Sequence, residues 1–590
     1  MSYSKYKDLL PKETIEKAMN ILSLLGIKCE ETSHHPSQHL YYTRLQIPLL
    51  GWGTNGKGTT EDYSRASAYG EMMERLQNLH LPDSMIESID KEAATHNGFK
   101  YYPDETHITI EHVFLELPDL KKDMCQTYQE AEGTMPNDEE LKHSWEKWNE
   151  GDSFTGLPFF SVKRNSVTTL PYEIVRRLCR SNGIASGNTF EEALCQALCE
   201  IIERYALERM FVDGLTPPEI PLSYISSNFP ELYATIKEVE AIGNFRILIR
   251  DGSLGKGLPV VCLFFIDYER QSYRIKLGCH PKFPIALERC LTELAQGTDF
   301  SERSNAKQMT SLNICGHNDW DTFKNWSSMF RSNKGCVPLS MFFSKPSWNF
   351  YEWDSLTDYD NKKGASLLMN LCLSISTDVY IRDNSFFGFP CVRVYVPGIS
   401  PVYKFNSLGK TNSISKHILN IVRDFPSHAK SLSIEDKNAL VNLFKDDYHF
   451  MYAERLGITI SVLLGTLYYD LGNTTAAVEC LSQEKMPSPF IKAAICELEM
   501  QARNIDENDR NRVLSIFFGQ KLTAYVALNW RNRNASQGFF DPFHIQKGNG
   551  GAPIINCNSL LKENFLNLYN RMKEIMVTHK VSQEKKIQII

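Results

Sequence analysis

Residues 193–207 read ALCQALCEIIERYAL, and all of them are apolar or cysteine except Gln196, Glu200, Glu203, Arg204 and Tyr205. A helix that is apolar nearly all round is buried in a protein core. The glutamine and the two glutamates follow one another at i, i+4 and i+7, so on a helix they form one polar stripe. An unpaired carboxylate in a core costs several kcal/mol or is neutralised. The stretch therefore predicts a buried helix whose carboxylates meet cations.

The same spacing of polar side chains occurs in three stretches, at Ser67/Glu71/Glu74, Gln196/Glu200/Glu203 and Arg289/Glu293/Gln296. The first two stripes both end in Glu-Arg, at residues 74–75 and 203–204. The third lies in ALERCLTELAQG, residues 286–297, again as a narrow polar stripe among apolar residues. If the three helices direct their stripes at one point, they form a pocket with several carboxylates.

The first two stripes belong to an internal repeat. The segments are TNGKGTTEDYSRASAYGEMMER at 54–75 and SNGIASGNTFEEALCQALCEIIER at 181–204. Both contain Asn-Gly, then a Gly-Thr or Asn-Thr helix entry, and both close with Glu-x-x-Glu-Arg. Two related turn–helix units that face each other would contribute equivalent ligands to one pocket.

Residues 51–60, GWGTNGKGTT, come close to the phosphate-binding loop G-x-x-x-x-G-K-[ST]. Gly58 stands where that loop needs a hydroxyl to bind Mg²⁺, and no apolar strand ended by aspartate stands out as its partner. We therefore interpret this segment as a Gly-rich turn that leads into the first acidic helix, expected at about 61–80.

Carboxylate and amide oxygens without His or Cys nearby suit hard cations, Mg²⁺ above all. Magnesium usually keeps waters and bridges to phosphates, so a nucleotide is the natural co-ligand. Arg204, Arg289 and a lysine from elsewhere would balance the polyphosphate, the arginines through bidentate pairing. The alternative from the residues alone is a buried structural network of ion pairs.

Composition describes an ordinary globular protein without a basic surface. The chain has 590 residues and a net charge of −7, and no Lys/Arg block argues for binding nucleic acid or an anionic membrane. No secretory signal or bilayer-spanning run is visible. The 15 cysteines include no C-x-x-C pair, which favours a reducing, cytoplasmic location. Cys195 and Cys199, one turn apart, are better explained as core thiols than as soft metal ligands.

The order of elements predicts an α+β fold with three domains. We expect an N-terminal helix and lead-in segment at 1–50 (helix 14–26, with Thr14 as a candidate cap), a core at 51–430 and an all-helical domain at 431–590. Strands are expected at 44–50, 245–250, 259–266 and 392–398, and the second and third acidic helices at about 190–211 and 284–296. The polar stretch 119–153 is interpreted as a surface insertion or a loop-rich excursion. GITISVLLGTLYYDLGNTTAAVECLSQ resembles one tetratricopeptide helix–turn–helix, without a sustained 34-residue period.

At these residues the chain resembles the YcaO-domain family. The matching stretches span residues 52 to about 400 and are TNGKGTTEDYSRASAYGEMMERL, SNGIASGNTFEEALCQALCEIIERY, RDGSLGKGLPVVCLFFID, HPKFPIALERCLTELAQG and VRVYVPGIS. The resemblance implies a core of mixed or antiparallel sheets and an ATP site in which three acidic helices hold Mg²⁺ in place of a P-loop.

The resemblance also implies residue roles. Metal contacts are expected from Glu71, Glu74, Asn188, Gln196, Glu200, Glu203, Glu293 and Gln296. ATP contacts are expected from Lys7, Thr14, Ser67, Ala185, Ser186, Arg204 and Arg289. Lys12 competes with Lys7 for the N-terminal lysine role, and either Ala185 or Ser186 faces the ligand.

Family members in peptide natural-product pathways phosphorylate a backbone amide oxygen while a nucleophile adds to the carbon, which yields an azoline, thioamide or amidine. Azoline-forming members commonly end in Pro-x-Pro-x-Pro, whereas this chain ends VSQEKKIQII. Length and the helical C-terminal region resemble the stand-alone members, which implies an accessory role in β-methylthiolation of a small-subunit ribosomal protein. Expected partners are a protein or peptide substrate, a methylthiotransferase or leader-binding protein, and a second copy in a homodimer. A nucleotide-bound adaptor without turnover is the alternative from another class.

Overall fold

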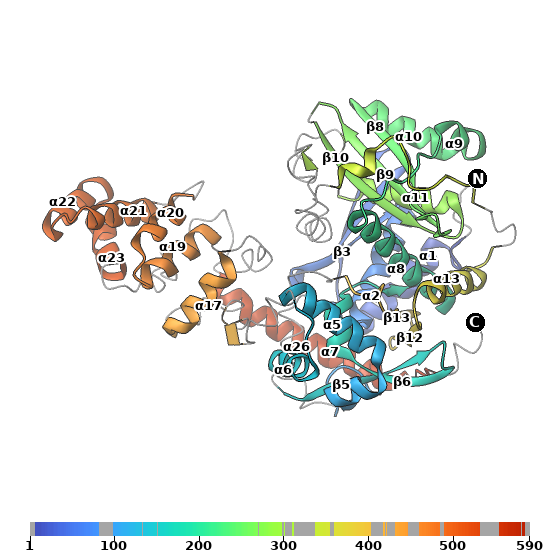
Figure 1. The fold of residues 1–590 in the computed structure, drawn as a ribbon, viewed down its shortest axis with the longest axis horizontal. Coiled ribbons are helices and arrows are strands. Elements are labelled where there is room, and N and C mark those ends of the chain that lie inside the picture. The colour runs from blue at the N-terminus through green and yellow to red at the C-terminus, as the bar shows by residue number, and fades with distance from the viewer. Residues whose placement is uncertain are drawn as a thin grey trace. The chain divides into compact units, whose positions relative to one another are not determined.

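The computed structural model describes residues 6–583 with gaps at 82–97, 133, 150, 270, 298–299, 301–309, 312–336, 354–358, 403–416, 419–420, 422–430, 446–458, 484–488, 531–553 and 580. The chain divides into two units. The first consists of Met1–Thr127, Ser153–Phe405 and Leu561–Ile590, and the second of Tyr128–Asp152 and Asn406–Leu560. Figure 1 shows the elements of each unit.

Three antiparallel sheets organise the first unit. One has the order β1-β2-β3, one β11-β10-β9-β8, and one β4-β5-β12-β13-β7 with β6 beside β5. The strands are β1 (Glu30–Ser37), β2 (Leu40–Ile47), β3 (Trp52–Gly58), β4 (Thr106–Thr109), β5 (Ser153–Ser161), β6 (Ser166–Pro171), β7 (Ile184–Ser186), β8 (Phe245–Asp251), β9 (Val260–Asp267), β10 (Ser272–Cys279), β11 (Thr310–Ser311), β12 (Tyr380–Asp383) and β13 (Cys391–Tyr395). Together with the helices below they confirm the α+β fold class.

Helices cover these sheets in the first unit. They are α1 (Pro11–Leu24), α2 (Glu61–Gln77), α4 (Ile110–Glu116), α5 (Pro118–Glu132, which continues into the second unit), α7 (Tyr172–Cys179), α8 (Phe190–Val212), α9 (Leu222–Asn228), α10 (Pro230–Ile242), α11 (Phe283–Ala295) and α13 (Asn361–Ile375). Two short 3₁₀ helices lie at Pro48–Leu50 and Leu339–Phe342. The three acidic helices expected from the sequence are α2, α8 and α11.

Helix α8 lies between two sheets, as Figure 1 shows. Its apolar side chains share one core with Cys262 of β9, Ile275 of β10 and Val392 of β13. Strand β9 is apolar on both faces, because Val261, Leu263 and Phe265 point instead into a second core that contains α10 and α11. The sheet β8–β10 therefore separates α8 from α11 and fixes where their polar stripes lie.

The repeated helix entry has a simple structural cause. Thr60 is the N-cap of α2 and accepts from the Tyr63 N–H, and Thr189 is the N-cap of α8 and accepts from the Glu192 N–H. A threonine in this place satisfies one of the N–H groups that a helix start leaves unpaired. A strand precedes the cap in both copies, β3 at residues 52–58 and the shorter β7 at residues 184–186. The interpretation of the first of these segments as a Gly-rich turn was wrong.

Two other local expectations were wrong. Residues 119–153 are not loop-rich, because α5 and α6 (Asp138–Asn149) occupy most of them. Buried Leu141 and Trp145 give α6 an apolar side that the many charged residues obscured. Thr14 is not a helix cap, because α1 begins after Leu10, whose N–H is capped by the Glu13 carboxylate at 2.8 Å.

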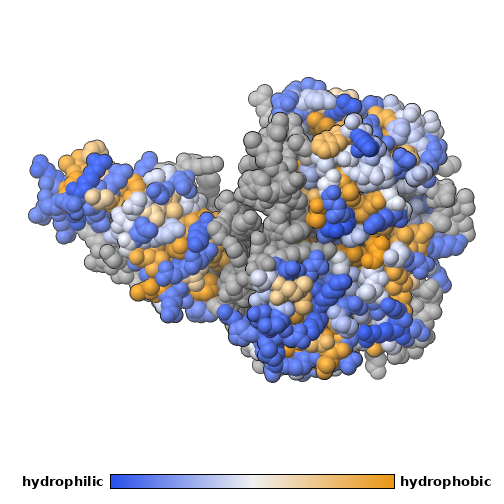
Figure 2. All heavy atoms as spheres, viewed as in Figure 1, coloured by the Kyte–Doolittle hydropathy of each residue, from blue (hydrophilic) through white to orange (hydrophobic). Residues whose placement is uncertain are grey.

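The described part of the second unit is helical. Its helices are α6, α17 (Ile434–Phe444), α19 (Ile460–Asp470), α20 (Thr474–Ser482), α21 (Pro489–Ala502), α22 (Glu507–Phe518) and α23 (Gln520–Trp530). Helices α19 and α20 pack as a pair around a turn at Gly472, which is the helix–turn–helix expected there. The visible face of this unit carries both hydrophilic and hydrophobic residues (Figure 2).

The last long helix, α26 (Ile554–Thr578), joins the first unit from Leu561 onward. Tyr569 and Lys573 donate to the backbone carbonyls of Lys100 and Phe99. Beyond the helix, Gln583 pairs with both backbone groups of Asp383, at 2.8 and 3.1 Å. Composition contained no signal for this return. No helix in the described ranges has the length and apolar content needed to cross a bilayer.

Replacing Gly56 by alanine will destabilise the first unit. A Cβ atom at Gly56 would lie 2.0 Å from the Ser64 carbonyl oxygen and 2.2 Å from the Ala68 nitrogen, so β3 and α2 must separate. We expect a loss of about 1–3 kcal/mol, typical of overpacking, in urea unfolding. Gly151→Ala is the control, because its Cβ meets nothing within 4 Å. An unchanged midpoint for Gly56→Ala would contradict the close approach.

Candidate functional site

On α2, both stripe carboxylates lie beside Arg75. The Arg75 guanidinium donates to Glu71 Oε1 from Nη2 at 3.1 Å, and its Nη1 lies 3.6 Å from Glu74 Oε1. Burial raises the pKa of Glu74 to about 8, although Arg75 opposes the shift, and the charge of Glu200 on α8 adds to it. The stripes of α2 and α8 therefore face each other across a site in which carboxylates are crowded.

On α8, the two stripe glutamates differ in their partners. Glu200 pairs with Arg204 at 2.5 Å, one turn further along the helix. Glu203 makes no ion pair or hydrogen bond with the described residues, and burial raises its pKa to about 7. The Lys57 charge opposes this shift and the Glu200 charge adds to it. Glu203 is thus a carboxyl group inside the site without a direct cationic partner.

Helix α11 joins α8 through its arginine. Arg289 donates to Gln196 Oε1 and to the Cys279 carbonyl oxygen, each at 2.6 Å. Glu293 forms an ion pair with Lys57 of β3. Gln296 points instead to β3, where it donates to the Asn55 carbonyl oxygen at 3.1 Å. The structure therefore brings Arg289 and Glu293 to the stripes and places Gln296 at their rim.

Two lysines that sequence reasoning did not assign also reach this region. Burial lowers the pKa of Lys57, while the charges of Glu203 and Glu71 partly restore it. Burial, Arg274 and Lys57 lower the pKa of Lys276 on β10 to about 7. The incomplete P-loop match at Gly56-Lys57 was the available signal for Lys57. Lys276 sits in the ordinary strand SYRIKLGC and had none.

The N-terminal segment closes over the start of α8. Lys7 Nζ lies 2.9 Å from Glu192 Oε1, and the Asp8 N–H donates to Glu192 Oε2 at 2.9 Å. Asn188 donates to the same carboxylate at 3.0 Å and accepts from the Thr14 hydroxyl at 2.7 Å. Although burial opposes ionisation, the Lys7 charge and these hydrogen bonds keep the pKa of Glu192 below its usual range.

The predicted residues Lys7, Thr14 and Asn188 thus lie together, and Glu192 joins them as a residue that the stripe spacing did not reveal. Lys12, the competing lysine, is exposed on α1. The hydroxyl of Ser186 donates to the Gly70 carbonyl oxygen at 2.7 Å, whereas Ala185 is fully buried in β7. Ser67 is half-buried on α2, one turn before Glu71.

Within the described ranges, no three His, Cys, Asp or Glu side chains are arranged to hold a metal ion. The ion pairs of the alternative interpretation are present, at Arg75, Arg204 and Lys57. They do not neutralise the whole site, because the pKa values of Glu74 and Glu203 remain raised. When a carboxyl group keeps its proton near neutral pH, a divalent cation that binds there displaces that proton. The oxygen donors therefore suit a hard cation once these pairs rearrange.

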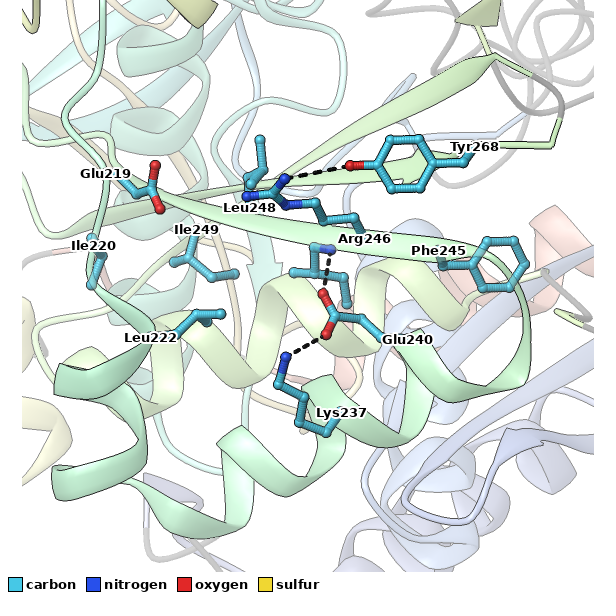
Figure 3. A pocket seen from close by; sticks show the side chains of 11 residues that line it. Glu219, Ile220, Leu222, Lys237, Glu240, Phe245, Arg246, Leu248, Ile249 and Tyr268 are labelled. Atoms are coloured by element: carbon cyan, nitrogen blue, oxygen red, sulfur yellow. Dashed lines mark hydrogen bonds and ion pairs between the residues drawn. The ribbon is translucent and has the colours of Figure 1, made fainter. Parts of the chain in front are cut away.

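A cavity of about 460 Å³ lies elsewhere, along edge strand β8 (Figure 3). Glu240 there accepts from the Ile247 N–H at 2.8 Å and from Lys237 at 2.7 Å, so its charges are already matched. None of the predicted site residues lines this cavity. This cavity is not the candidate ATP and metal site, because the crowded carboxylates of that site lie on α2 and α8.

The sequence pattern described as "YcaO cyclodehydratase, ATP- and Mg2+-binding" matches residues 55–400. The match covers more than half of the chain and contains all three stripes. The chain belongs to the YcaO family.

Individual relatives are distant. The ribosomal protein S12 methylthiotransferase accessory factor YcaO of Escherichia coli (strain K12) is 28% identical over 426 residues, 71% of this chain and 70% of that protein. Among solved structures, a heterocyclase in complex with substrate and cofactor has a TM-score of 0.47 at 17% identity, covering 67% of this chain and 53% of that one. YcaO from Methanopyrus kandleri bound with AMPPCP and Mg²⁺ has a TM-score of 0.40 at 16% identity, covering 67% and 92%.

The raised pKa of Glu74 predicts a pH dependence of stability. The native carboxyl keeps its proton up to about pH 8, while the unfolded one loses it near its usual 4.5, so native stability falls as pH rises between these values. We expect the urea midpoint of the metal-free protein to decline from pH 5 to pH 8, and to decline less in Glu74→Gln.

The control for this prediction is Glu16→Gln, an exposed position on α1. It should keep the wild-type profile. Identical profiles for wild type and Glu74→Gln would show that Glu74 does not titrate in this window.

Proposed function

We propose that this protein is an ATP- and Mg²⁺-dependent YcaO protein that activates a backbone amide of a protein or peptide by phosphorylation, or that supports β-methylthiolation of a small-subunit ribosomal protein as an accessory factor. The observation that carries the proposal is the group of carboxyls from α2 and α8 that keep raised pKa values despite nearby arginines. Such a group lacks positive charge that a bound divalent cation would supply.

The proposed ligand set is the one that the resemblance to the YcaO family implies. Metal contacts are assigned to Glu71, Glu74, Asn188, Gln196, Glu200, Glu203, Glu293 and Gln296. Nucleotide contacts are assigned to Lys7, Thr14, Ser67, Ala185 through its backbone, Ser186, Arg204 and Arg289. Bound Mg²⁺ would position the triphosphate and neutralise its charge.

The chain's own cations have a defined part in this site. Arg204 and Arg289 hold Glu200 and Gln196 in the structure, and both present guanidinium groups that pair well with phosphate oxygens. Lys7 at the start of α8 adds a point charge that Glu192 keeps in place. When anionic phosphates and a cation enter together, Arg204 would exchange the Glu200 carboxylate for phosphate oxygens, and Arg289 would exchange the Gln196 amide oxygen.

The acceptor assignment rests on the Escherichia coli relative, whose name makes it an accessory factor of ribosomal protein S12 methylthiolation. The helical second unit supports a partner-dependent role. Ile516 and Phe517 near the end of α22 are 69% and 75% exposed, which is unusual for large apolar side chains that stand next to each other. The same feature favours the second candidate, a nucleotide-bound adaptor that docks a partner enzyme without turnover. A peptide natural-product enzyme that forms azolines or thioamides with a leader-binding partner is the remaining alternative.

Glu200→Gln will weaken Mg²⁺-dependent ATP binding at least about tenfold, because it removes a charged metal ligand from the shared site. Isothermal titration with and without Mg²⁺ measures the effect. Glu191→Gln, in the first turn of the same helix but outside the stripe, is the matched control and should bind as wild type does. Unchanged tight binding in Glu200→Gln would remove the site assignment.

The function itself is tested by mass spectrometry of the proteome with and without the gene, and with the Glu200→Gln copy. Loss of β-methylthiolation on ribosomal protein S12 in the deletion supports the accessory role, and dehydrated or sulfur-bearing backbone positions on another peptide support the natural-product role. If the Glu200→Gln copy restores the modification fully although its ATP binding is lost, the modification needs no nucleotide on this chain, which contradicts both amide activation and a nucleotide-bound adaptor.

A further inference from the structure

Arg393 of β13 is a buried cation without an anionic partner among the described residues. Its side chain is 1% exposed, and only Nη2 is hydrogen-bonded, to the Asn78 carbonyl oxygen at 3.2 Å. Nε and Nη1 are buried and have no hydrogen-bond partner. The guanidinium also lies 5.5 Å from the Tyr172 ring centroid, a contact that supplies no counter-charge. A buried charge in this state is costly unless something binds to it.

The neighbouring strand shows how this fold satisfies a buried guanidinium. Arg382 of β12 stands directly opposite Arg393 in the β12–β13 pairing. It is equally buried, but it forms two hydrogen bonds with the Asp104 carboxylate, at 2.9 and 2.7 Å. The two arginines lie opposite each other in the sheet, but only Arg382 has a carboxylate bonded to it. Arg393 therefore lacks the counter-ion that the fold supplies to Arg382.

The surroundings of Arg393 are positive as well. Burial and the charges of Arg75, Arg393 and other arginines lower the pKa of His80 well below its usual range, so the imidazole is neutral. Arg176 lies 5.6 Å from the same Tyr172 ring that Arg393 contacts. His80, Arg75 and Arg176 are only half-buried, whereas Arg393 lies at the base of the group. Arg75 is held by Glu71 and Glu74, so the positive charge beside the Tyr172 ring comes from Arg393 and Arg176.

We propose that Arg393, with Arg176 beside the same Tyr172 ring, binds one oxyanion, a phosphate group or a carboxylate, at a site separate from the carboxylate stripes. The unused N–H groups of Arg393 are its donors, and hydrogen bonds to a charged acceptor are the strong ones. The inference stands independently of the proposed function, because no stripe carboxylate and no metal takes part. The anion has two chemical sources that the test separates, a phosphate group or a carboxylate.

The test uses the full-length protein and its melting temperature in chloride buffer at fixed ionic strength, with low millimolar phosphate or acetate added. A ligand that binds only the folded state raises the melting temperature, by about 2 °C or more once the site is saturated. We expect this rise in the wild type. Arg393→Met should melt at the wild-type temperature or higher in chloride, because the substitution removes a buried charge without a partner, and it should lose the anion-induced rise.

Arg382→Met is the matched control. It leaves Asp104 without its partner, so it should melt lower in every buffer yet keep the anion-induced rise. Glu200→Gln should also keep it, which separates this inference from the proposed function. If Arg393→Met does not fold, the same measurement is made on Arg393→Lys. We expect this variant to bind the anion about tenfold more weakly than the wild type, or weaker still.

The outcomes separate the sources. A rise with phosphate alone supports a phosphoryl group, and a rise with acetate supports a carboxylate. No rise with either anion in the wild type, or an equal rise in wild type and in the Arg393 variants, overturns the proposal.

Discussion

The burial of α8 is the constraint on which the rest of the first unit depends. The helix lies between two sheets and is largely buried, whereas the side chains of its polar stripe are half-buried and therefore only partly solvated. Arg204 meets Glu200 within the helix, but Gln196 is held by Arg289 from α11. The stripe therefore fixes the position of α11, and β9, apolar on both faces, keeps that spacing.

The same need for partners ties distant segments to the start of α8. Glu192 collects Lys7, the Asp8 amide and Asn188 around one carboxylate. Asn361, the first residue of α13, then donates to the Tyr6 carbonyl oxygen at 2.9 Å and to Asp8 at 3.0 Å. An N-terminal segment is usually poorly held unless such bonds fix it. Here the segment becomes a wall of the candidate site.

The sequence allowed the acidic helices to be predicted because their signal is periodic and local: an apolar helix with one polar stripe, capped by Thr60 or Thr189. It was misleading at residues 52–58, where three glycines and polar residues suggested a turn. Gly56 and Gly58 serve instead to let β3 approach α2, a contact between segments that no local pattern reveals. For the same reason Lys276 and Glu192, and the return of α26 to Phe99 and Lys100, were not predictable. They depend on which surfaces meet.

In the described part of the chain, Glu203 of α8 and Arg393 of β13 lack a bonded counter-ion, and they have opposite sign when ionised. Glu203 makes no ion pair and Arg393 has no anionic partner there, and no hydrogen bond or ion pair joins the two. A network built only for stability would gain by pairing them or by replacing both with apolar residues. Keeping them apart costs stability and leaves one place for a cation and another for an anion. That separation is what a protein needs when its ligands, and not its own side chains, complete the charge balance.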